Sequence, residues 1–435
     1  MNSNWMTSLN NTLDRTLPPA LQYLPFVFRK PVEQRFSNGI PLHILEAPGQ
    51  EVVRIDFVFA AGQWHQAQKL QALFTCRMLR EGCHGYSSSA FAERLDYYGA
   101  WLDLSVAMNR TFVTLYTLKK FFPQTIALVQ HMLFEPMFDA AQLHTIKDNN
   151  KAQLMVNMQK GDVLALRALR CSVYGTDHPC GMLVSADDYD LLYPELLSDY
   201  YHRYYGSRNC TIYLSGDIDA SVIAEVESLF GDAEWGSGSS PSEREYILAP
   251  SIEKHHTIVH PGAVQSSIRM GTLLMEVNDA DYLPMRVLNT VFGGYFGSRL
   301  MKNIREEKGY TYHISSDLVT NTSQIMFMVS CEALSDRDGE VVDEVSREMR
   351  RLQVEPISAD ELLMVRNYMV GEICRNYEGA FALTDAYIFM EHLGLPPDHI
   401  EQTVEAIRTT DACVLQYLAQ RYFNPEKLHS VVVKS

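Results

Sequence analysis

Two side chains in the second half of the chain, Arg305 and Tyr312, are candidates for binding a carboxylate or a developing oxyanion. The guanidinium of arginine is permanently charged, and a tyrosine hydroxyl can donate a hydrogen bond to the same kind of oxygen. A simpler interpretation treats Arg305 as a charge favoured near the end of a helix and Tyr312 as a half-buried strand aromatic. The residue types alone therefore leave a binding pair and a structural pair both open.

A glycine-rich turn, a short helix and a strand are predicted to position this pair within residues 290–315. Ser298 is suited to begin the helix as its N-cap, and Gly309 can take the left-handed conformation that ends it. Arg305 then lies in the last helical turn, and Tyr312 lies on the strand that follows. The predicted apolar face of the helix consists of Leu300, Met301 and Ile304.

The composition is that of an ordinary globular protein without the charge pattern of a nucleic-acid-binding protein. The chain has 435 residues, of which 46% are hydrophobic and 21% charged, and a formal net charge of −16 at pH 7. This length is enough for two or three domains. No stripe of Lys and Arg offers a partner for a phosphate backbone. An acidic surface can attract basic peptides, although solubility explains the charge equally well.

Targeting signals are not evident, which leads us to expect a cytoplasmic protein. The N-terminus has no basic leader, and no window reaches the roughly 18 apolar residues of a membrane helix. Eight cysteines occur without a C-x-x-C pair, which favours free thiols in a reducing compartment. A periplasmic location stays open if a leader has been removed.

Two pairs of similar segments indicate an internal repeat. The segment E-P-M-F-D-A-A-Q-L at 135–143 is similar to E-P-I-S-A-D-E-L at 355–362, with an offset of 220 residues. The segment R-Y-Y-G-S-R-N-C-T-I-Y-L at 203–214 is similar to R-Y-F-N-P-E-K-L-H-S-V-V-V at 421–433, with an offset of 218. Because two separate landmarks share nearly one offset of a domain's length, we predict two copies of one domain.

The intermixed helix and strand signals predict the α+β class, with two similar domains in tandem. Each should consist of a largely antiparallel sheet packed against helices. A hairpin with Asn38 and Gly39 at its turn opens the first half, and the segment from Asp232 to Glu245 has the composition of a linker. We predict an N-terminal extension at 1–25, a first domain at 26–231, a linker at 232–250 and a second domain at 251–435.

The run around the arginine and tyrosine resembles a peptidase signature. It reads S-R-L-M-K-N-I-R-E-E-K-G-Y-T-Y and is similar to the second-half signature of the pitrilysin (insulinase) zinc metallopeptidases, which include the mitochondrial processing peptidase subunits. In that family an arginine and a tyrosine with this spacing bind the peptide substrate beside the zinc ion. The resemblance implies the same two-domain fold from about Phe26 onward, and a peptide-binding role for Arg305 and Tyr312.

The zinc motif of that family is not preserved in this chain. Family members carry H-x-x-E-H on a helix, where two histidines ligate zinc and the glutamate is the general base, and a later helix supplies a third ligand. Aligned on M-L-R-E-G, the two histidine positions hold Leu73 and Arg77, and the general-base position holds Cys76. The third ligand position holds Asn157, and Asn150 replaces an acid seven residues earlier.

These substitutions predict that the chain binds no metal. Leu73 has no lone pair, the amide of Asn157 is a poor zinc ligand, and Arg77 puts a positive charge where Zn²⁺ would sit. We expect Leu73 in the core and Arg77 paired with a carboxylate. The nearby histidines 255, 256 and 260 lack the usual ligand spacing, so we expect no other metal site there.

The resemblance implies a non-catalytic, zinc-free subunit of a two-chain peptidase. In several bacterial members, one chain carries H-x-x-E-H and a second chain of similar length lacks it but supplies the arginine and tyrosine. We expect this chain to have no cofactor, to bind an extended peptide, and to be inactive without a zinc-bearing partner, with neither nucleic acid nor membrane as a partner. Two alternatives stay open: a structural chain in which the pair only packs, and a peptide-binding homodimer without proteolytic activity.

Overall fold

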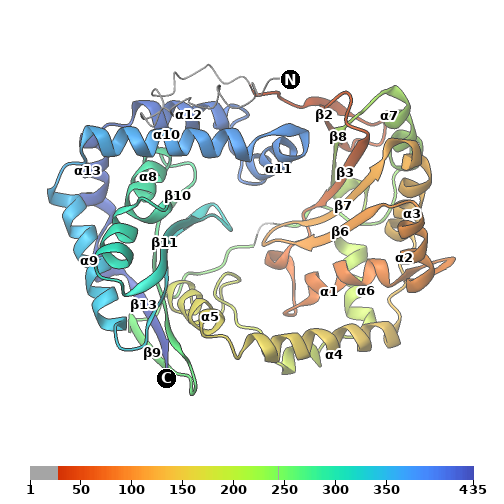
Figure 1. Ribbon diagram of the computed structural model, residues 1–435. Helices are drawn as coiled ribbons and strands as arrows, with labels where there is room; N and C mark the ends of the chain where they lie inside the picture. Colours follow the sequence, from red (N-terminus) through yellow and green to blue (C-terminus); the bar gives the residue numbers. More distant parts are fainter. Residues whose placement is uncertain (1–27, 243) are drawn as a thin grey trace, which may run out of the picture.

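Two helix-covered sheets form the two halves of the computed structural model, which describes residues 28–242 and 244–435 (Figure 1). The predicted extension at 1–25 lies outside the described residues. The first sheet contains β1 (Val32–Arg35), β2 (Pro41–Glu46), β3 (Val52–Phe59), β6 (Trp101–Val106), β7 (Thr111–Leu118) and β8 (Cys210–Gly216). The second sheet contains β9 (His255–Val259), β10 (Gln265–Glu276), β11 (Thr311–Val319), β12 (Gln324–Leu334) and β13 (His429–Lys434). A separate two-stranded sheet pairs β4 (Gly82–Cys83) with β5 (Tyr86–Ser87).

The two large sheets have the same strand order. The first runs β1-β2-β8-β3-β7-β6, and the second, read from its β9 edge, runs β9-β13-β10-β12-β11. The pair at the start of each common order, β2 with β8 and β9 with β13, is parallel, whereas the remaining pairs are antiparallel. Apart from the extra strand β1, the halves therefore match strand for strand. This confirms the predicted α+β class with two similar, largely antiparallel halves.

Among the helices, α4 and α10 can be matched between the halves. The first half contains α1 (Gln71–Met78), α2 (Ser88–Tyr97), α3 (Phe122–Phe134), α4 (Ala140–Asn157), α5 (Gly161–Tyr174), α6 (Pro194–Tyr204) and α7 (Ala220–Val226). The second half contains α8 (Tyr282–Asn289), α9 (Asp338–Val354), α10 (Ala359–Asn376), α11 (Gly379–His392), α12 (His399–Thr409) and α13 (Ala412–Tyr422). The repeated E-P segments lead into equivalent N-caps, because Asp139 accepts from the Gln142 amide and Ser358 from the Glu361 amide. No described helix combines the length and apolarity needed to cross a membrane.

Each half has its own large hydrophobic core. In the first half, Phe57 and Phe230 are fully buried with ring centroids 4.7 Å apart. In the second half, Phe292 and Phe327 meet Phe423 beneath the sheet. Burying a side chain of this kind contributes about 1.5–3 kcal/mol, so the cores are the main source of stability in both halves.

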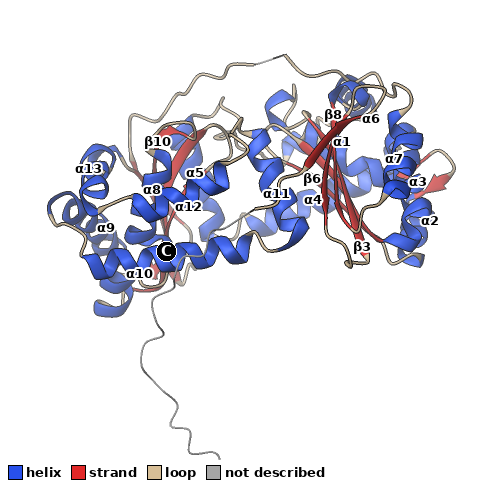
Figure 2. Cartoon of the chain, turned by 90° about the horizontal axis from the view of Figure 1, so that it is seen from above, coloured by secondary structure: helices blue, strands red, loops and turns tan. Residues whose placement is uncertain are grey.

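One helix from each half packs against the sheet of the other half. Helix α5 lies on the second sheet, where Leu169 joins a cluster with Val431 and Val433 of β13. Helix α11 lies on the first sheet, where Ile388 packs against Val58 and Tyr213. Figure 2 shows both helices between the two sheets. The halves are therefore joined by an exchange of equivalent helices.

The predicted linker contains no helix or strand in its described part, between Gly231 and His255. Its beginning is nevertheless attached to the first core, because Trp235 is buried with its ring 5.0 Å from that of Phe134. The domain boundaries given above stay a prediction. The predicted hairpin turn is present, with Gly39 at φ +91° between β1 and β2.

Candidate functional site

Arg305 lies on a helical segment that begins after Ser298 and ends at Gly309. Leu300, Met301 and Ile304 are buried in the second core, as the apolar pattern predicted. Gly309 takes the left-handed conformation with φ +66°, as expected for the residue that ends the helix.

The segment differs from the predicted helix in its hydrogen bonding. Residues Met301–Glu307 (η8) form a π-helix, closed by a bond from the Lys308 amide to the Asn303 carbonyl oxygen at 3.1 Å. A π turn holds one residue more than an α turn, and such turns occur frequently at functional sites. Arg305 lies inside the loop that this bond closes.

The guanidinium of Arg305 is held on two sides. Its Nε donates to the carbonyl oxygen of Tyr312 at 3.0 Å. Its guanidinium carbon lies 4.5 Å from the centre of the Phe296 ring, a cation–π distance. Its Nη1 is 3.9 Å from a carboxylate oxygen of Glu306, a distance beyond hydrogen bonding. The Nη atoms therefore make no hydrogen bond within the described chain and are free to bind an external carbonyl or carboxylate.

Tyr312 projects from a bulge at the start of β11. The register between β11 and β12 shifts between Thr311 and Ile314, and the hydroxyl of Thr311 accepts from the His313 amide at 3.1 Å. Bulges of this kind redirect a side chain away from the sheet. Tyr312 is 82% exposed, and its hydroxyl has no hydrogen-bond partner among the described residues. Tyr312 is therefore not the half-buried strand aromatic of the simpler interpretation.

The positions aligned with the zinc motif lie in the first half, on α1 and α4. Arg77 donates through Nη1 to the amide oxygen of Asn150, which joins the two helices. The expectation of a carboxylate partner for Arg77 is wrong, because the group that faces it on α4 is a neutral amide. Burial lowers the pKa of Arg77, although a guanidinium keeps its charge at neutral pH. The charged guanidinium of Arg77 therefore occupies a position where a metal ion would need a neutral or negative ligand.

The other three aligned positions do not form a ligand set. Leu73 packs at the edge of an apolar cluster between α1, α4 and α6, and it is only partly buried. The thiol of Cys76 is fully buried, and burial raises its pKa to about 12, so it cannot act as a general base at neutral pH. Asn157 accepts a hydrogen bond at 3.2 Å from Gln153 of its own helix. The assignment of these positions to a former zinc site stays a prediction.

Metal-binding side chains do not gather elsewhere in the described residues, where no three His, Cys, Asp or Glu side chains are placed to hold an ion. The histidines noted in the sequence have other partners. His255 and His256 contact the hydroxyls of Ser430 and Ser172 at 2.7 and 3.2 Å. His260 contacts the carbonyl oxygen of Gln159 at 3.0 Å.

The Arg305–Tyr312 pair and the aligned zinc positions lie in different halves. Figure 1 places α1 next to the first sheet and α4 below α1, and β11 lies at an edge of the second sheet. No hydrogen bond or ion pair between described side chains connects the two regions. Sequence reasoning missed Phe296, because an aromatic residue in a glycine-rich turn, nine positions before the arginine, belongs to no helical or strand period.

The comparisons with known proteins point to one family. Residues 192–369 match the family model described as "Peptidase M16 inactive domain", a range that includes the arginine and the tyrosine. The chain is 22% identical over 347 residues to an "Uncharacterized zinc protease YmxG" of Bacillus subtilis, covering 79% of this chain and 83% of that protein. It is 21% identical over 326 residues to a "Non-peptidase homolog YmxG" of Helicobacter pylori, covering 74% of each.

Solved structures show the same fold. A peptidase M16 inactive domain from Pseudomonas fluorescens superposes with a TM-score of 0.82 at 21% identity, covering 93% of this chain and 98% of that chain. A protease from Helicobacter pylori superposes with a TM-score of 0.80 at 12% identity, covering 93% and 100%. The solved structures define the fold, and the sequence matches point to M16 peptidases and their inactive relatives. This similarity confirms the resemblance that the signature around Arg305 predicted.

Proposed function

We propose that this chain is the non-catalytic, zinc-free subunit of a two-chain M16 peptidase. It would bind an extended peptide and supply Arg305 and Tyr312 to the active site of a partner chain that carries H-x-x-E-H and zinc. The single observation that carries this proposal is the orientation of Arg305. Its Nε bonds the Tyr312 carbonyl oxygen and one face of the guanidinium lies against Phe296, while its Nη atoms make no hydrogen bond within the described chain and the Tyr312 side chain is exposed.

Such a pair is suited to stabilise negative charge on a peptide carbonyl. Donors that are oriented before the reaction need no reorganisation when the oxyanion develops, which makes them effective in a transition state. The two donors come from one chain and the metal from another, so the active site would be complete only in the complex. The free state of all eight cysteines supports a reducing, cytoplasmic location for that complex.

The packing alternative has less support. A purely structural arginine–tyrosine pair would bury the ring or use its hydroxyl, whereas Tyr312 does neither within the described chain. A peptide-binding homodimer uses the same exposed pair, and it differs from the proposal only in lacking a zinc-bearing partner. It would therefore bind peptides but leave them intact.

The test is reconstitution of this chain with a chain of similar length that carries H-x-x-E-H and is encoded beside it. We expect peptide cleavage only when both chains are present. Arg305→Ala and Tyr312→Phe should each reduce turnover about a hundredfold or more, because one lost oxyanion donor costs about 2.7–4 kcal/mol of barrier. Folding stability should change by no more than about 0.5 kcal/mol in Tyr312→Phe, as at other surface positions. Arg305→Ala also loses the bond to the Tyr312 carbonyl and the contact with Phe296, so it should lose about 1 kcal/mol.

The outcome that contradicts the proposal is wild-type turnover in both variants. The chain would then be a scaffold. Cleavage by this chain alone, lost together with one bound zinc on chelation, would contradict its assignment as the non-catalytic subunit.

A further inference from the structure

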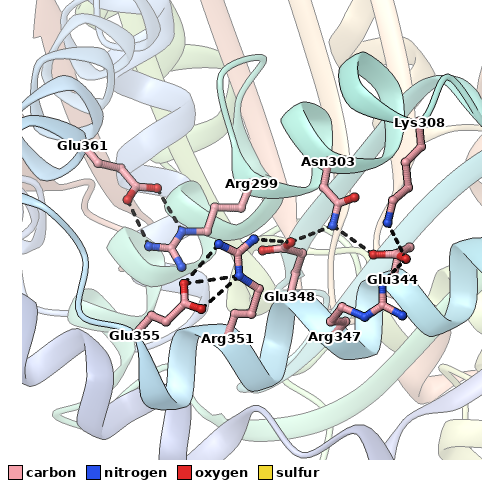
Figure 3. Close-up of polar contacts among 9 residues, drawn as sticks. All are labelled: Arg299, Asn303, Lys308, Glu344, Arg347, Glu348, Arg351, Glu355 and Glu361. Carbon is pink, nitrogen blue, oxygen red and sulfur yellow. Dashed lines mark hydrogen bonds and ion pairs between the residues drawn. The ribbon is translucent and has the colours of Figure 1, made fainter.

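The segment that carries Arg305 is attached to α9 and α10 by a network of charged side chains (Figure 3). At its start, Arg299 makes a two-fold hydrogen bond to Glu361 of α10, with both distances at 3.0 Å. In its middle, Asn303 donates to Glu348 of α9 at 2.6 Å. At its end, Lys308 is paired with Glu344, which also belongs to α9.

Glu344 contacts both ends of the π turn that encloses Arg305. Its Oε2 accepts from the Nδ2 of Asn303 at 3.1 Å, and its Oε1 is paired with the Nζ of Lys308. The same two residues close the turn through their backbones, from the Lys308 amide to the Asn303 carbonyl oxygen. One carboxylate therefore connects the two ends of a turn whose middle presents Arg305.

The carboxylate is ionised where it lies. Glu344 is 6% exposed. Burial alone would raise its pKa, but the hydrogen bonds from Lys308 and Asn303 and the nearby charges lower the pKa below the ordinary value. Arg347, one turn along α9, also donates to it. A charged acceptor forms stronger hydrogen bonds than a neutral one, so both contacts depend on this charge.

These buried polar contacts are not the most stabilising way to pack the segment that carries Arg305 against α9. The Oδ1 of Asn303 and the Oε2 of Glu348 are buried without a hydrogen-bond partner among the described residues, although Glu348 is only 1% exposed. Apolar side chains of similar volume are often neutral or stabilising when they replace a buried charged network. Directional contacts instead fix the orientation of the turn, which an apolar contact would leave free to slide.

We infer that Glu344 is a positioning residue, whose carboxylate ties the two ends of the π turn and thereby fixes the direction in which Arg305 points. Asn303 and Arg305 are two positions apart, so they project to nearly opposite sides of the segment. The contact with α9 therefore lies behind the guanidinium and leaves its binding side open. The functional consequence of this inference rests on the proposed role of Arg305.

The first test uses the chain alone. In protein labelled with ¹⁵N-arginine, Arg305→Ala identifies the Nε–H resonance that reports the bond to the Tyr312 carbonyl. We expect Glu344→Gln to shift or broaden this resonance, because an amide cannot accept at both of its ends. The matched control is Asp338→Asn, which changes the same group on the same helix, where it pairs with Lys434 at 2.9 Å. The control should leave the resonance in place.

The second test measures turnover in the reconstituted complex. We expect Glu344→Gln to lower kcat on the order of tenfold to a hundredfold with little change in KM, as small displacements of a catalytic group do. The double variant with Arg305→Ala should be no slower than Arg305→Ala alone, since Glu344 acts through that side chain. If Glu344→Gln does not fold, Lys308→Gln releases one end of the turn from a more exposed position and is measured in the same way.

The outcomes separate the inference from the proposed function. An unmoved resonance in the folded Glu344 variant, or losses that multiply in the double variant, would overturn the positioning role. Wild-type turnover in Arg305→Ala would instead contradict the proposed function, and the resonance would still decide whether Glu344 fixes the turn.

Discussion

Each half contains one arginine at a candidate site position, and the two side chains differ in their burial and in their contacts. Arg77 in the first half is partly buried and donates to the neutral amide of Asn150, between two helices. Arg305 in the second half lies at the surface, with its plane against Phe296 and only its Nε occupied. The charge is the same in both, so the difference lies in what each guanidinium contacts. Arg77 joins two helices of one half, whereas Arg305 is held at the surface against the exposed ring of Phe296.

Among the substitutions that test this comparison, replacement of Arg305 by lysine should have the largest effect on turnover. Arg305→Lys keeps the charge but loses the planar group that stacks on Phe296 and bonds the Tyr312 carbonyl. We expect turnover of the reconstituted complex to fall nearly as far as in Arg305→Ala, about a hundredfold, because a lysine does not reproduce oriented arginine donors. Turnover within about twofold of wild type would mean that charge alone is sufficient.

Replacing Arg77 should affect stability and leave turnover unchanged. Arg77→Ala leaves the side-chain oxygen of Asn150 without its partner, at a cost of about 1–3 kcal/mol in the free energy of unfolding. Chemical denaturation of the chain measures this loss. Arg77→Ala combined with Asn150→Ala is the control, because removal of both partners should recover part of the stability. A fall in kcat for the folded single variant would contradict the structural role given to Arg77.

The buried thiol of Cys76 should react more slowly with a thiol reagent than the exposed cysteines do. Burial raises its pKa to about 12, so almost no thiolate is present at pH 8 and a thiol reagent should leave it unmodified in the folded chain. The exposed Cys374 and Cys413 should react first. Mass spectrometry of peptides after brief alkylation measures the difference. Rapid modification of Cys76 would show that α1 opens to solvent.

Zinc should have the smallest effect, because we expect neither its addition nor its removal to change the melting temperature of the chain. Purified chain should contain far less than one zinc per molecule, and adding zinc or a chelator should leave its melting temperature unchanged. The physical reason is the cation of Arg77 and the missing donor at Leu73, which remove the two histidine positions of the motif. Elemental analysis with about one zinc per chain would contradict the interpretation of these positions.

Sequence reasoning predicted the features of this molecule that depend on local pattern. The repeat offsets led to two matching sheets, and the apolar spacing of Leu300, Met301 and Ile304 identified the buried face of the segment. The left-handed Gly309 followed from the chemistry of helix ends. Each of these features can be recognised from residues that are close in the sequence or from the similarity of two segments.

The features that were missed depend on contacts between distant residues. The partner of Arg77 is an asparagine 73 positions away, and Glu344 lies 41 positions from Asn303. The π geometry of the turn was also missed, because its extra residue is accommodated through contacts with α9 rather than through helix propensity. The exchange of α5 and α11 could not be predicted either, since both helices read as ordinary members of their own half.

That exchange means that the two halves form one thermodynamic unit. A fragment that ends in the linker would keep α5 but lose the β13 face on which α5 packs, and its own sheet would lose the cover that α11 provides. Each fragment would then expose apolar surface that only the other can bury, so a nicked chain should stay associated and unfold in a single transition. The buried pair of Arg54 and Asp56 adds to this coupling, because Arg54 also bonds Asp385 of α11 at 2.5 Å. A gene cut at the linker would thus encode an obligate two-part protein rather than two independent domains.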